Sequence, residues 1–350
     1  MMDGQHSGAG TVGRELTVAG LTQGLLQPST RFRWSQYRTL FQDAGLDTRD
    51  LHARFSAYPP QAGWQRPVWG LAALADARLR VARANREANL AFLQRHLLST
   101  LHTAERALKI PYVFDVDDAI FLGTRGESAD AIARGARHIV CGNAFLADHF
   151  QRFGPVTILP TAVDTDHFTV RSAPPVRPTL GWSGSSSGFT YLYAIEDALA
   201  QVMRALPQVQ LHIVADRPPA FAKLPPERVH FTRWQPDIEV EVLKTFTVGL
   251  MPLEDSPWAR GKCSFKMLTY MSCALPCVVS PVGMNREVLD LGACGLAAEG
   301  AQSWADALHA LLSDEAMAWS LGQTGRRIVE QHFARRVVGA QLVELLRREV

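Results

Sequence analysis

The sequence predicts an α/β protein with two doubly wound parallel sheets, and three observations lead to this prediction. Short apolar runs alternate with longer amphipathic stretches along the chain, as strands and their covering helices do in such folds. The 350 residues exceed what one hydrophobic core usually holds. A segment with four prolines, 160–178, interrupts the alternation before it starts again. We therefore predict domains over residues 14–163 and 164–330, followed by a terminal segment, 331–350.

The first half of the chain contains the expected elements of one sheet. Apolar runs predict strands at 16–21, 111–118, 138–141 and 156–159. Amphipathic stretches predict helices at 37–44, where Gly45 follows, and at 76–98 and 144–153. Leu, Phe and Ala recur at helical spacing in 90–108, so this stretch is also predicted to be helical.

The second half repeats the alternation of strands and helices. Strands are predicted at 179–182, 210–215, 229–231, 248–251 and 276–280. Helices are predicted at 191–205, 238–245, 266–274, 304–312 and 315–333.

The composition bounds the function. The net charge is only +2, so the chain lacks the strong basic excess of a nucleic-acid-binding protein, and that class is not supported. Basic residues nevertheless outnumber acidic ones between residues 66 and 109, which indicates either a solvated helix face or a surface for anionic lipid or a phosphorylated acceptor. The five cysteines have no zinc-ribbon or disulfide pattern, so reduced thiols are expected.

The sequence also suggests where the protein acts. No apolar run is long enough to span a membrane, and residues 1–15 have the composition of a disordered segment rather than of a signal peptide. We therefore expect a cytoplasmic protein, either free or held at a membrane surface.

A basic loop between a strand and a helix is the strongest candidate site. Arg260, Gly261, Lys262 and Ser264 precede a helix that begins near residue 265 and carries Lys266. Free N–H groups at a helix start attract anions, and the cations suit a diphosphate. The alternative is an exposed basic loop without a ligand.

Three acids follow a buried apolar run. In an extended strand, Asp115 and Asp117 would point to one face and Asp118 to the other, at the carboxyl end where α/β folds bind ligands. They could hold Mg²⁺, or Asp117 could act on a reacting group, or Asp117 or Asp118 could cap a helix.

Further candidates follow other predicted strands. Gly184 and Ser185 lie in a Gly- and Ser-rich loop, 181–188, that could donate hydrogen bonds to phosphate or be a flexible turn. Arg31 and Arg33 come after the first strand, and Arg233 and Trp234 come after strand 229–231. The arginines could bind a ligand or be surface residues, and Trp234 could border a nucleotide base or simply pack. The serines and histidines form no recognisable catalytic triad, so the sequence gives poor support for a hydrolase.

The order of these motifs resembles that of glycosyltransferase family 4. FKMLTYMSCALP, CVVSP and VGMNREVL (residues 265–289) resemble its donor-binding half. ILPTAVDTDHF (158–168) resembles its interdomain segment, whereas IPYVFDVDDAIF (110–121) and QPSTRFRWSQY (27–37) resemble the DVDDALF strand and the first loop of one branch.

The resemblance implies a GT-B fold of two Rossmann-like domains facing a cleft, with helix 335–349 crossing back to the first domain. It also implies a retaining, metal-independent sugar transfer from a nucleotide-sugar, which is a substrate and not a cofactor, to a sugar, lipid-linked or small-molecule acceptor. Asp117, Lys262 and Lys266 would be catalytic, and Arg31, Arg33 and Asp118 would bind the acceptor. The donor would contact the following residues: Gly184, Ser185, Arg233, Trp234, Arg260, Gly261, Ser264, Thr269, Gly283, Asn285 and Glu287.

The chain departs from the family at one pair of positions. The family's Glu-x7-Glu pair aligns with Gly261 and Thr269, so those contacts must be replaced or lost. Glu254, Asp255 or Glu287 could substitute. The departure leaves two alternatives open: a nucleotide-sugar epimerase or hydrolase of the same fold, and a non-catalytic nucleotide-sugar-binding protein.

Overall fold

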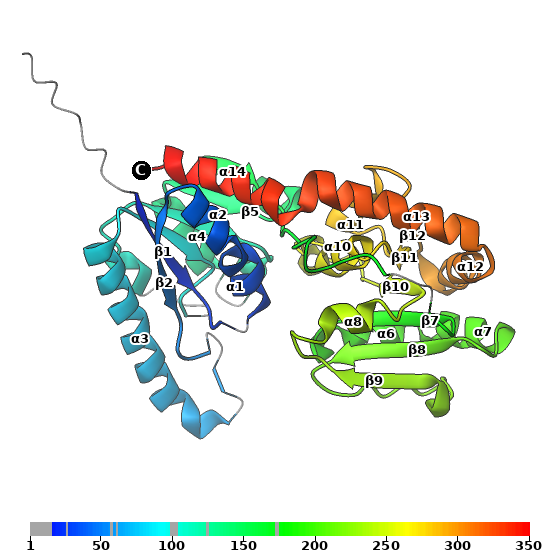
Figure 1. Cartoon of the computed structure of the whole chain (residues 1–350). Helices are drawn as coiled ribbons and strands as arrows, with labels where there is room; N and C mark the ends of the chain where they lie inside the picture. The colour runs from blue at the N-terminus through cyan, green and yellow to red at the C-terminus, as the bar shows by residue number, and fades with distance from the viewer. Residues whose placement is uncertain are drawn as a thin grey trace, which may run out of the picture.

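The computed structural model describes residues 16–25, 27–56, 59–60, 62–98, 104–123, 126–171 and 175–350. Residues 1–15, predicted to be a disordered segment, lie outside these ranges. The described chain forms two α/β units, each built on a six-stranded parallel sheet, and a long C-terminal helical segment runs across both (Figure 1). The fold class predicted from the sequence is confirmed.

The first sheet has the strand order β2-β1-β3-β4-β5-β6. Its strands are β1 (Thr17–Thr22), β2 (Asp47–His52), β3 (Leu90–Gln94), β4 (Tyr112–Val116), β5 (His138–Cys141) and β6 (Val156–Ile158). Its helices are α1 (Pro28–Arg33), α2 (Arg38–Asp43), α3 (Arg66–Glu87), α4 (Glu127–Gly135) and α5 (Ala144–Phe150). Proline in the first turn of α1 and the side-chain cap of Asn143 on α5 begin these helices in the usual way.

The second sheet has the order β12-β11-β10-β7-β8-β9. Its strands are β7 (Thr179–Ser183), β8 (Gln210–Ala215), β9 (Val229–Arg233), β10 (Val248–Met251), β11 (Cys277–Val279) and β12 (Leu296–Ala297). The helices of this half are α6 (Phe189–Ala194), α7 (Glu196–Ala205), α8 (Glu239–Leu243), α9 (Pro257–Arg260), α10 (Phe265–Ser272), α11 (Met284–Leu289), α12 (Gly300–Ser313) and α13 (Glu315–Ile328).

The C-terminal segment joins the two units. A π-helical turn, Val329–Phe333, links α13 to α14 (Arg335–Arg348). The apolar side of α14 is buried with Val18, Trp34 and Tyr37 of the first unit. A backbone bond from Arg335 N–H to the Val163 carbonyl, 2.8 Å long, fixes the point where the helix crosses. The domain boundaries drawn from the sequence remain a prediction.

Two helix predictions in the first half need correction. The helix predicted at 90–108 is wrong in its first part and the helix predicted at 76–98 is wrong in its last part, because α3 ends at Glu87 and Leu90–Gln94 form strand β3. Every residue of β3 is buried because it is a central strand of a parallel sheet, so it lacks the alternation that would distinguish it from a buried helix. Strand β2 was not predicted, because it lies at the sheet edge and is mostly polar, so it lacks the apolar run by which the other strands were recognised.

No helix in the described part of the chain is both long and apolar enough to cross a membrane.

Candidate functional site

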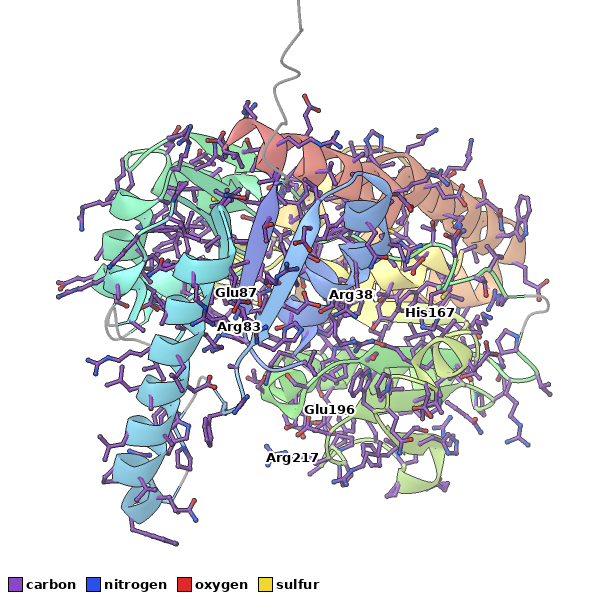
Figure 2. The ribbon with its side chains drawn as sticks, turned by 60° about the vertical axis from the view of Figure 1, so that its left-hand side comes forward. Arg38, Arg83, Glu87, His167, Glu196 and Arg217 are labelled. Carbon is purple, nitrogen blue, oxygen red and sulfur yellow. The ribbon has the colours of Figure 1, made fainter. Side chains whose placement is uncertain are left out.

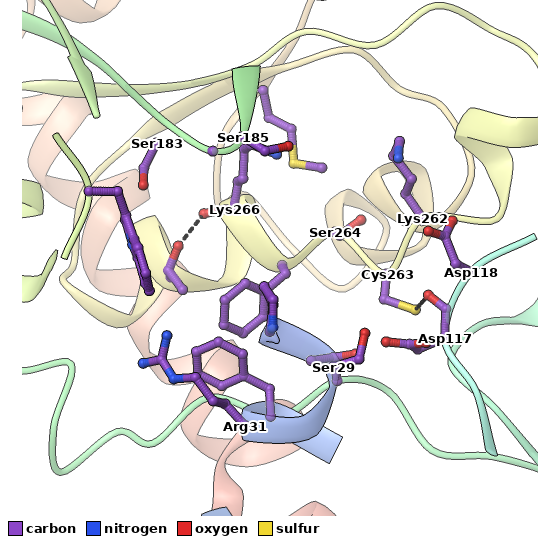
Figure 3. Close-up of a pocket in the computed structure, with 18 of the residues that line it drawn as sticks. Ser29, Arg31, Asp117, Asp118, Ser183, Ser185, Lys262, Cys263, Ser264 and Lys266 are labelled. Carbon is purple, nitrogen blue, oxygen red and sulfur yellow. Dashed lines mark hydrogen bonds between the residues drawn. The ribbon is translucent and has the colours of Figure 1, made fainter. Parts of the chain in front are cut away.

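A cavity of about 440 Å³ lies between the two units, at the carboxyl ends of their sheets (Figure 3). This is where open α/β sheets bind ligands. The first unit contributes α1 and the segments after β3 and β4. The second contributes the loop after β7, the segments after β8 and β9, and the loop leading into α10. Both halves of the chain therefore face one site.

Lys262 and Lys266 form the basic wall of the cavity. Lys266 lies in the first turn of α10, with its ammonium 5.2 Å from the centre of the Trp182 ring. Burial, and then the neighbouring Lys262, lower the pKa of Lys266 to about 8. Among the described residues neither lysine forms an ion pair, although the Asp118 carboxylate interacts with Lys262 from a greater distance. The wall therefore presents positive charge that the protein offsets only in part.

The start of α10 reinforces this positive wall. Ser264 precedes the helix with φ 49°, in the left-handed region. Its hydroxyl donates to Asn285 Oδ1 at 2.6 Å, and Asn285 in turn donates to the Ser280 carbonyl at 2.9 Å. Asn285 therefore holds Ser264 in place without lining the cavity itself. The first-turn N–H groups of a helix have no intrahelical acceptor, so this end attracts anions.

The loop after β7 approaches Lys266 from the other side. Gly184 and Ser185 line the cavity, and Asp216 accepts hydrogen bonds from Ser186 N–H at 2.6 Å and from its hydroxyl at 2.8 Å. A Cβ on Gly184 would lie only 2.5 Å from Lys266 Cε. It would also lie 2.8 Å from the buried Trp182 ring, so any side chain at this position would press on both the lysine and the tryptophan.

Asp117 and Asp118 face the lysines from the first unit. Strand β4 ends at Val116, so the strand alternation expected for these acids does not reach them, and both line the cavity. Arg95 pairs with Asp117 and lies 3.5 Å from an Asp118 oxygen. Burial alone would raise the pKa of Asp117, but Arg95 and Arg33 hold it below its ordinary value. Burial raises the pKa of Asp118, with Arg95 and Lys262 opposing the rise.

Asp115 has a different role from its neighbours. Its carboxylate is fully buried and accepts from Arg33 Nη2 at 2.5 Å, while Arg33 Nη1 donates to the Leu159 carbonyl at 2.7 Å. Burial lowers the pKa of Arg33, but the Asp115 carboxylate outweighs this effect and raises it above its ordinary value. Arg33, predicted to bind the acceptor, is thus an internal ion-pair partner behind the cavity wall.

Arg31, Trp234 and Glu239 form a cluster at another end of the cavity. The Arg31 guanidinium carbon lies 5.4 Å from the Trp234 ring centre, and Arg31 Nη2 lies 3.9 Å from Glu239 Oε2. Burial raises the pKa of Glu239. Within the described part of the chain, Arg31 Nη1 and Glu239 Oε2 are buried without a hydrogen-bond partner. Such atoms are costly unless a ligand satisfies them.

Several residues predicted to bind the donor lie outside the cavity lining. Arg233 ends β9 and is exposed, Glu287 is exposed on α11, and Arg260 is exposed and pairs with Asp255 at 2.7 Å. Gly261 and Gly283 are needed for packing: a Cβ on Gly261 would lie 2.5 Å from Ala119 Cβ, and one on Gly283 would lie 2.7 Å from the Arg260 carbonyl. Thr269 does line the cavity, and its hydroxyl donates to the Lys266 carbonyl at 2.8 Å.

Arg95, Asp216 and Glu239 line the cavity but were not predicted. Arg95 lay inside the stretch misassigned as helix, and it follows β3 directly with φ 52°. A correct strand assignment would have placed it at the carboxyl edge of the sheet. Asp216 and Glu239 also follow strands β8 and β9, which is the signal that could have found them.

No set of three or more His, Cys, Asp or Glu residues within the described ranges is arranged to hold a metal ion.

Comparisons with known proteins agree with the fold. Residues 177–314 match the family model described as glycosyl transferases group 1. No curated protein matches the sequence significantly.

Solved structures match over nearly the whole chain. Sucrose-phosphate synthase from Thermosynechococcus elongatus is 15% identical, with a TM-score of 0.70, over 95% of this chain and 98% of its own. Anabaena HepE in complex with UDP-glucose is 15% identical, with a TM-score of 0.65, over 95% and 100%. WaaG, a glycosyltransferase involved in lipopolysaccharide biosynthesis, is 11% identical, with a TM-score of 0.65, over 95% and 99%. Residues 177–314 therefore match the glycosyl transferases group 1 family model, and the chain as a whole has the GT-B fold of these solved structures.

Proposed function

We propose that this chain transfers a sugar from a nucleoside-diphosphate donor to a hydroxyl acceptor, with retention of anomeric configuration and without a metal ion. The observation that carries the proposal is a single cavity in which two unpaired lysines and a helix start face the Asp117 carboxylate. Charge develops on the diphosphate as the glycosidic bond breaks, and fixed cations stabilise that charge. Lys262 and Lys266 would supply this stabilisation.

The donor would lie along the second unit. Its diphosphate would meet Lys262, Lys266, Ser264 and the loop at Gly184. Its base would lie by Trp234, which offers a flat stacking face, and the unpartnered atoms of Arg31 and Glu239 would bind polar groups of the nucleoside. The HepE neighbour was solved with UDP-glucose, which makes uridine donors the first to test.

Glu239 is our candidate to replace the carboxylates missing at Gly261 and Thr269. It is buried in the cavity wall, whereas Glu254 and Asp255 line a separate cavity and Glu287 lines neither. Glu239 Oε2 is in ion-pair range of Arg31 but has no hydrogen-bond partner, so it can accept from a sugar or ribose hydroxyl.

The reacting carbon would lie between the lysines and Asp117. Arg95 keeps Asp117 ionised, so its carboxylate can stabilise a positively charged, oxocarbenium-like centre. Asp118, whose pKa is raised, would accept a hydrogen bond from the acceptor hydroxyl.

We also propose that α3 holds the protein at an anionic membrane surface. Trp64, Val68, Leu71 and Leu79, on and just before this helix, are between 70% and 79% exposed. Val68, Leu71 and Leu79 fall on one side at spacings of three and eight residues. The N-terminal half of α3 extends beyond the rest of the first unit (Figures 1 and 2).

The charges around this apolar stripe favour a lipid surface. The exposed charged residues of α3 are basic: Arg66, Arg78, Arg83 and Arg86, of which Arg83 and Arg86 pair with the half-buried Glu87. A second copy docking here would oppose Arg66 and Arg78 with other arginines, whereas anionic headgroups complement them. This placement would suit a lipid-linked acceptor.

Donor binding and donor consumption together test the function. Thermal-shift titrations with UDP-, GDP- and ADP-sugars should raise the melting temperature with one of them, because a ligand of the folded state stabilises it. Sugar should then transfer only when an acceptor is present. Rapid consumption of donor alone would instead support an epimerase or hydrolase, and binding without turnover on any acceptor would support a non-catalytic protein.

A further inference from the structure

The loop that carries Lys262 is held by a side chain from the other unit. Asn143 caps α5, with Oδ1 accepting from Leu146 N–H at 3.0 Å. Its Nδ2 donates to the Arg260 carbonyl at 3.1 Å and to the Lys262 carbonyl at 3.0 Å. Asn143 is 1% exposed, so this one amide uses both of its donor hydrogens on the loop and its acceptor on the helix.

Three further contacts seat the same loop on the first unit. Cys263 Sγ donates to the Asp117 carbonyl at 3.2 Å (dashed in Figure 3). Gly261 lies against Ala119, and a Cβ on Gly142 would lie 2.2 Å from Cys263 Sγ. The backbone of residues 260–263 is therefore fixed by the segments that follow β4 and β5, although it belongs to the second unit.

This arrangement determines where the Lys262 ammonium lies. Hydrogen bonds to the Arg260 and Lys262 carbonyls hold the peptide before Gly261 and the peptide after Lys262, so the short backbone segment that carries the lysine is held at both ends. If the two units separate, the carbonyls lose the Asn143 amide and Cys263 loses the Asp117 carbonyl. The loop would then keep only the restraints of its own unit, such as the Arg260–Asp255 ion pair and the bond from Lys262 N–H to the Ala259 carbonyl.

We propose that Asn143 is a positioning residue that couples closure of the two units to assembly of the diphosphate-binding loop. This inference rests on the proposed function, because it takes Lys262 to be a diphosphate ligand. Closure over the donor places Asn143 under the loop, and the loop presents Lys262 only while it is seated there. The first unit thereby contributes to donor binding without touching the donor at this point.

Asn143→Ser in the full chain tests the proposal. Serine keeps an N-cap acceptor for α5 but lacks the amide donors. Asp314→Ser is the matched control, because Asp314 caps α13 by accepting from Met317 N–H at 2.8 Å and lies far along the chain from this loop. We expect Asn143→Ser to weaken binding of the tightest binder among UDP, GDP and ADP by about tenfold, as loss of two neutral hydrogen bonds does. The control should bind within twofold of wild type.

A double-mutant cycle separates positioning from a merely structural role. If Asn143 acts through Lys262, the loss of affinity from Lys262→Ala should be much smaller in the Asn143→Ser background than in wild type. Additive losses, or Asn143→Ser binding within twofold of wild type, would overturn the proposal.

Hydrogen exchange gives a readout that does not depend on the nucleotide. Without nucleotide, amides of residues 257–264 should exchange faster in Asn143→Ser than in wild type or Asp314→Ser. Equal exchange rates of these amides in Asn143→Ser and wild type would refute the claim that Asn143 holds the loop in place. Failure of wild type to bind any nucleoside diphosphate, with the exchange difference intact, would instead refute the proposed function and only the donor-binding part of this inference.

Discussion

Lys266→Met should make the protein more stable and at the same time disable donor binding. The Lys266 ammonium is enclosed beside Trp182 and Lys262, and among the described residues it has no anionic partner. Methionine has a similar length and no charge to bury. The substitution therefore removes an electrostatic cost from the folded state and a ligand from the diphosphate.

The magnitude follows from the pKa of Lys266. A fall from 10.5 to about 8 corresponds to about 3 kcal/mol of destabilisation while the lysine is charged, an upper bound because the side chain keeps some contact with solvent. For an α/β protein of two domains, each kcal/mol moves the melting temperature by roughly 2–4 °C. We expect Lys266→Met to melt about 3–8 °C above wild type at pH 7.

The pH dependence has a definite sign. Because the folded-state pKa lies below the unfolded-state pKa, the unfolded chain binds more protons between about pH 8 and 10.5, and wild-type stability gains with pH in that window. The variant lacks this gain. The stability that Lys266→Met gains over wild type should thus be largest below pH 8 and should shrink as the pH rises towards 10.5.

Differential scanning calorimetry at pH 7 and pH 9.5, with nucleotide titrations at pH 7, measures both effects. Lys223→Met is the matched control, because Lys223 is exposed and pairs with the exposed Asp197 at 2.6 Å. It should change stability by less than about 1 kcal/mol and leave binding intact. A Lys266→Met protein that melts below wild type at pH 7, or that binds nucleoside diphosphate as well as wild type, would refute the reasoning.

Four other substitutions test separate parts of the account. Lys262→Ala should lower kcat by roughly 10²–10³, as loss of one charge-stabilising donor does, and near-normal turnover would exclude its role. Asp117→Asn should lower kcat by about 10²–10⁴ with little change in donor affinity by calorimetry, whereas an equal loss of affinity would move Asp117 to donor binding. Arg33→Met should destabilise the fold by about 3–5 kcal/mol in urea unfolding, because it leaves a buried carboxylate unpaired, and a stable variant would contradict the internal ion pair. Leu71→Ser should weaken binding to phosphatidylglycerol vesicles in a sedimentation assay about fivefold or more, whereas Trp319→Ser, at a similarly exposed residue, should not; loss of self-association instead would identify a dimer interface.

The basic loop could be predicted because its signal is local. Lys262, Ser264 and Lys266 are neighbours in sequence, and a strand, a loop and a helix in that order suffice to place them at an anion-binding helix start. The parallel pairing within each sheet could also be predicted from the alternation of strands and helices, since parallel strands need crossover connections.

The rest of the site depends on contacts between distant segments. Nothing in the local sequence distinguishes Arg33, which pairs with Asp115, from Arg31, which lines the cavity: both lie on α1, and only the packing of that helix on the sheet separates their roles. Likewise, Asn143 carries the pattern of an ordinary helix cap, and its second role exists only when the two units meet.

A crystal structure with a bound nucleoside diphosphate tests the central claim most directly. The account predicts diphosphate oxygens within about 3 Å of the Lys262 or Lys266 ammonium, at the start of α10, with the base beside Trp234. Diphosphate bound instead in the second cavity, of about 350 Å³, beside Glu254 and Arg286 would contradict it.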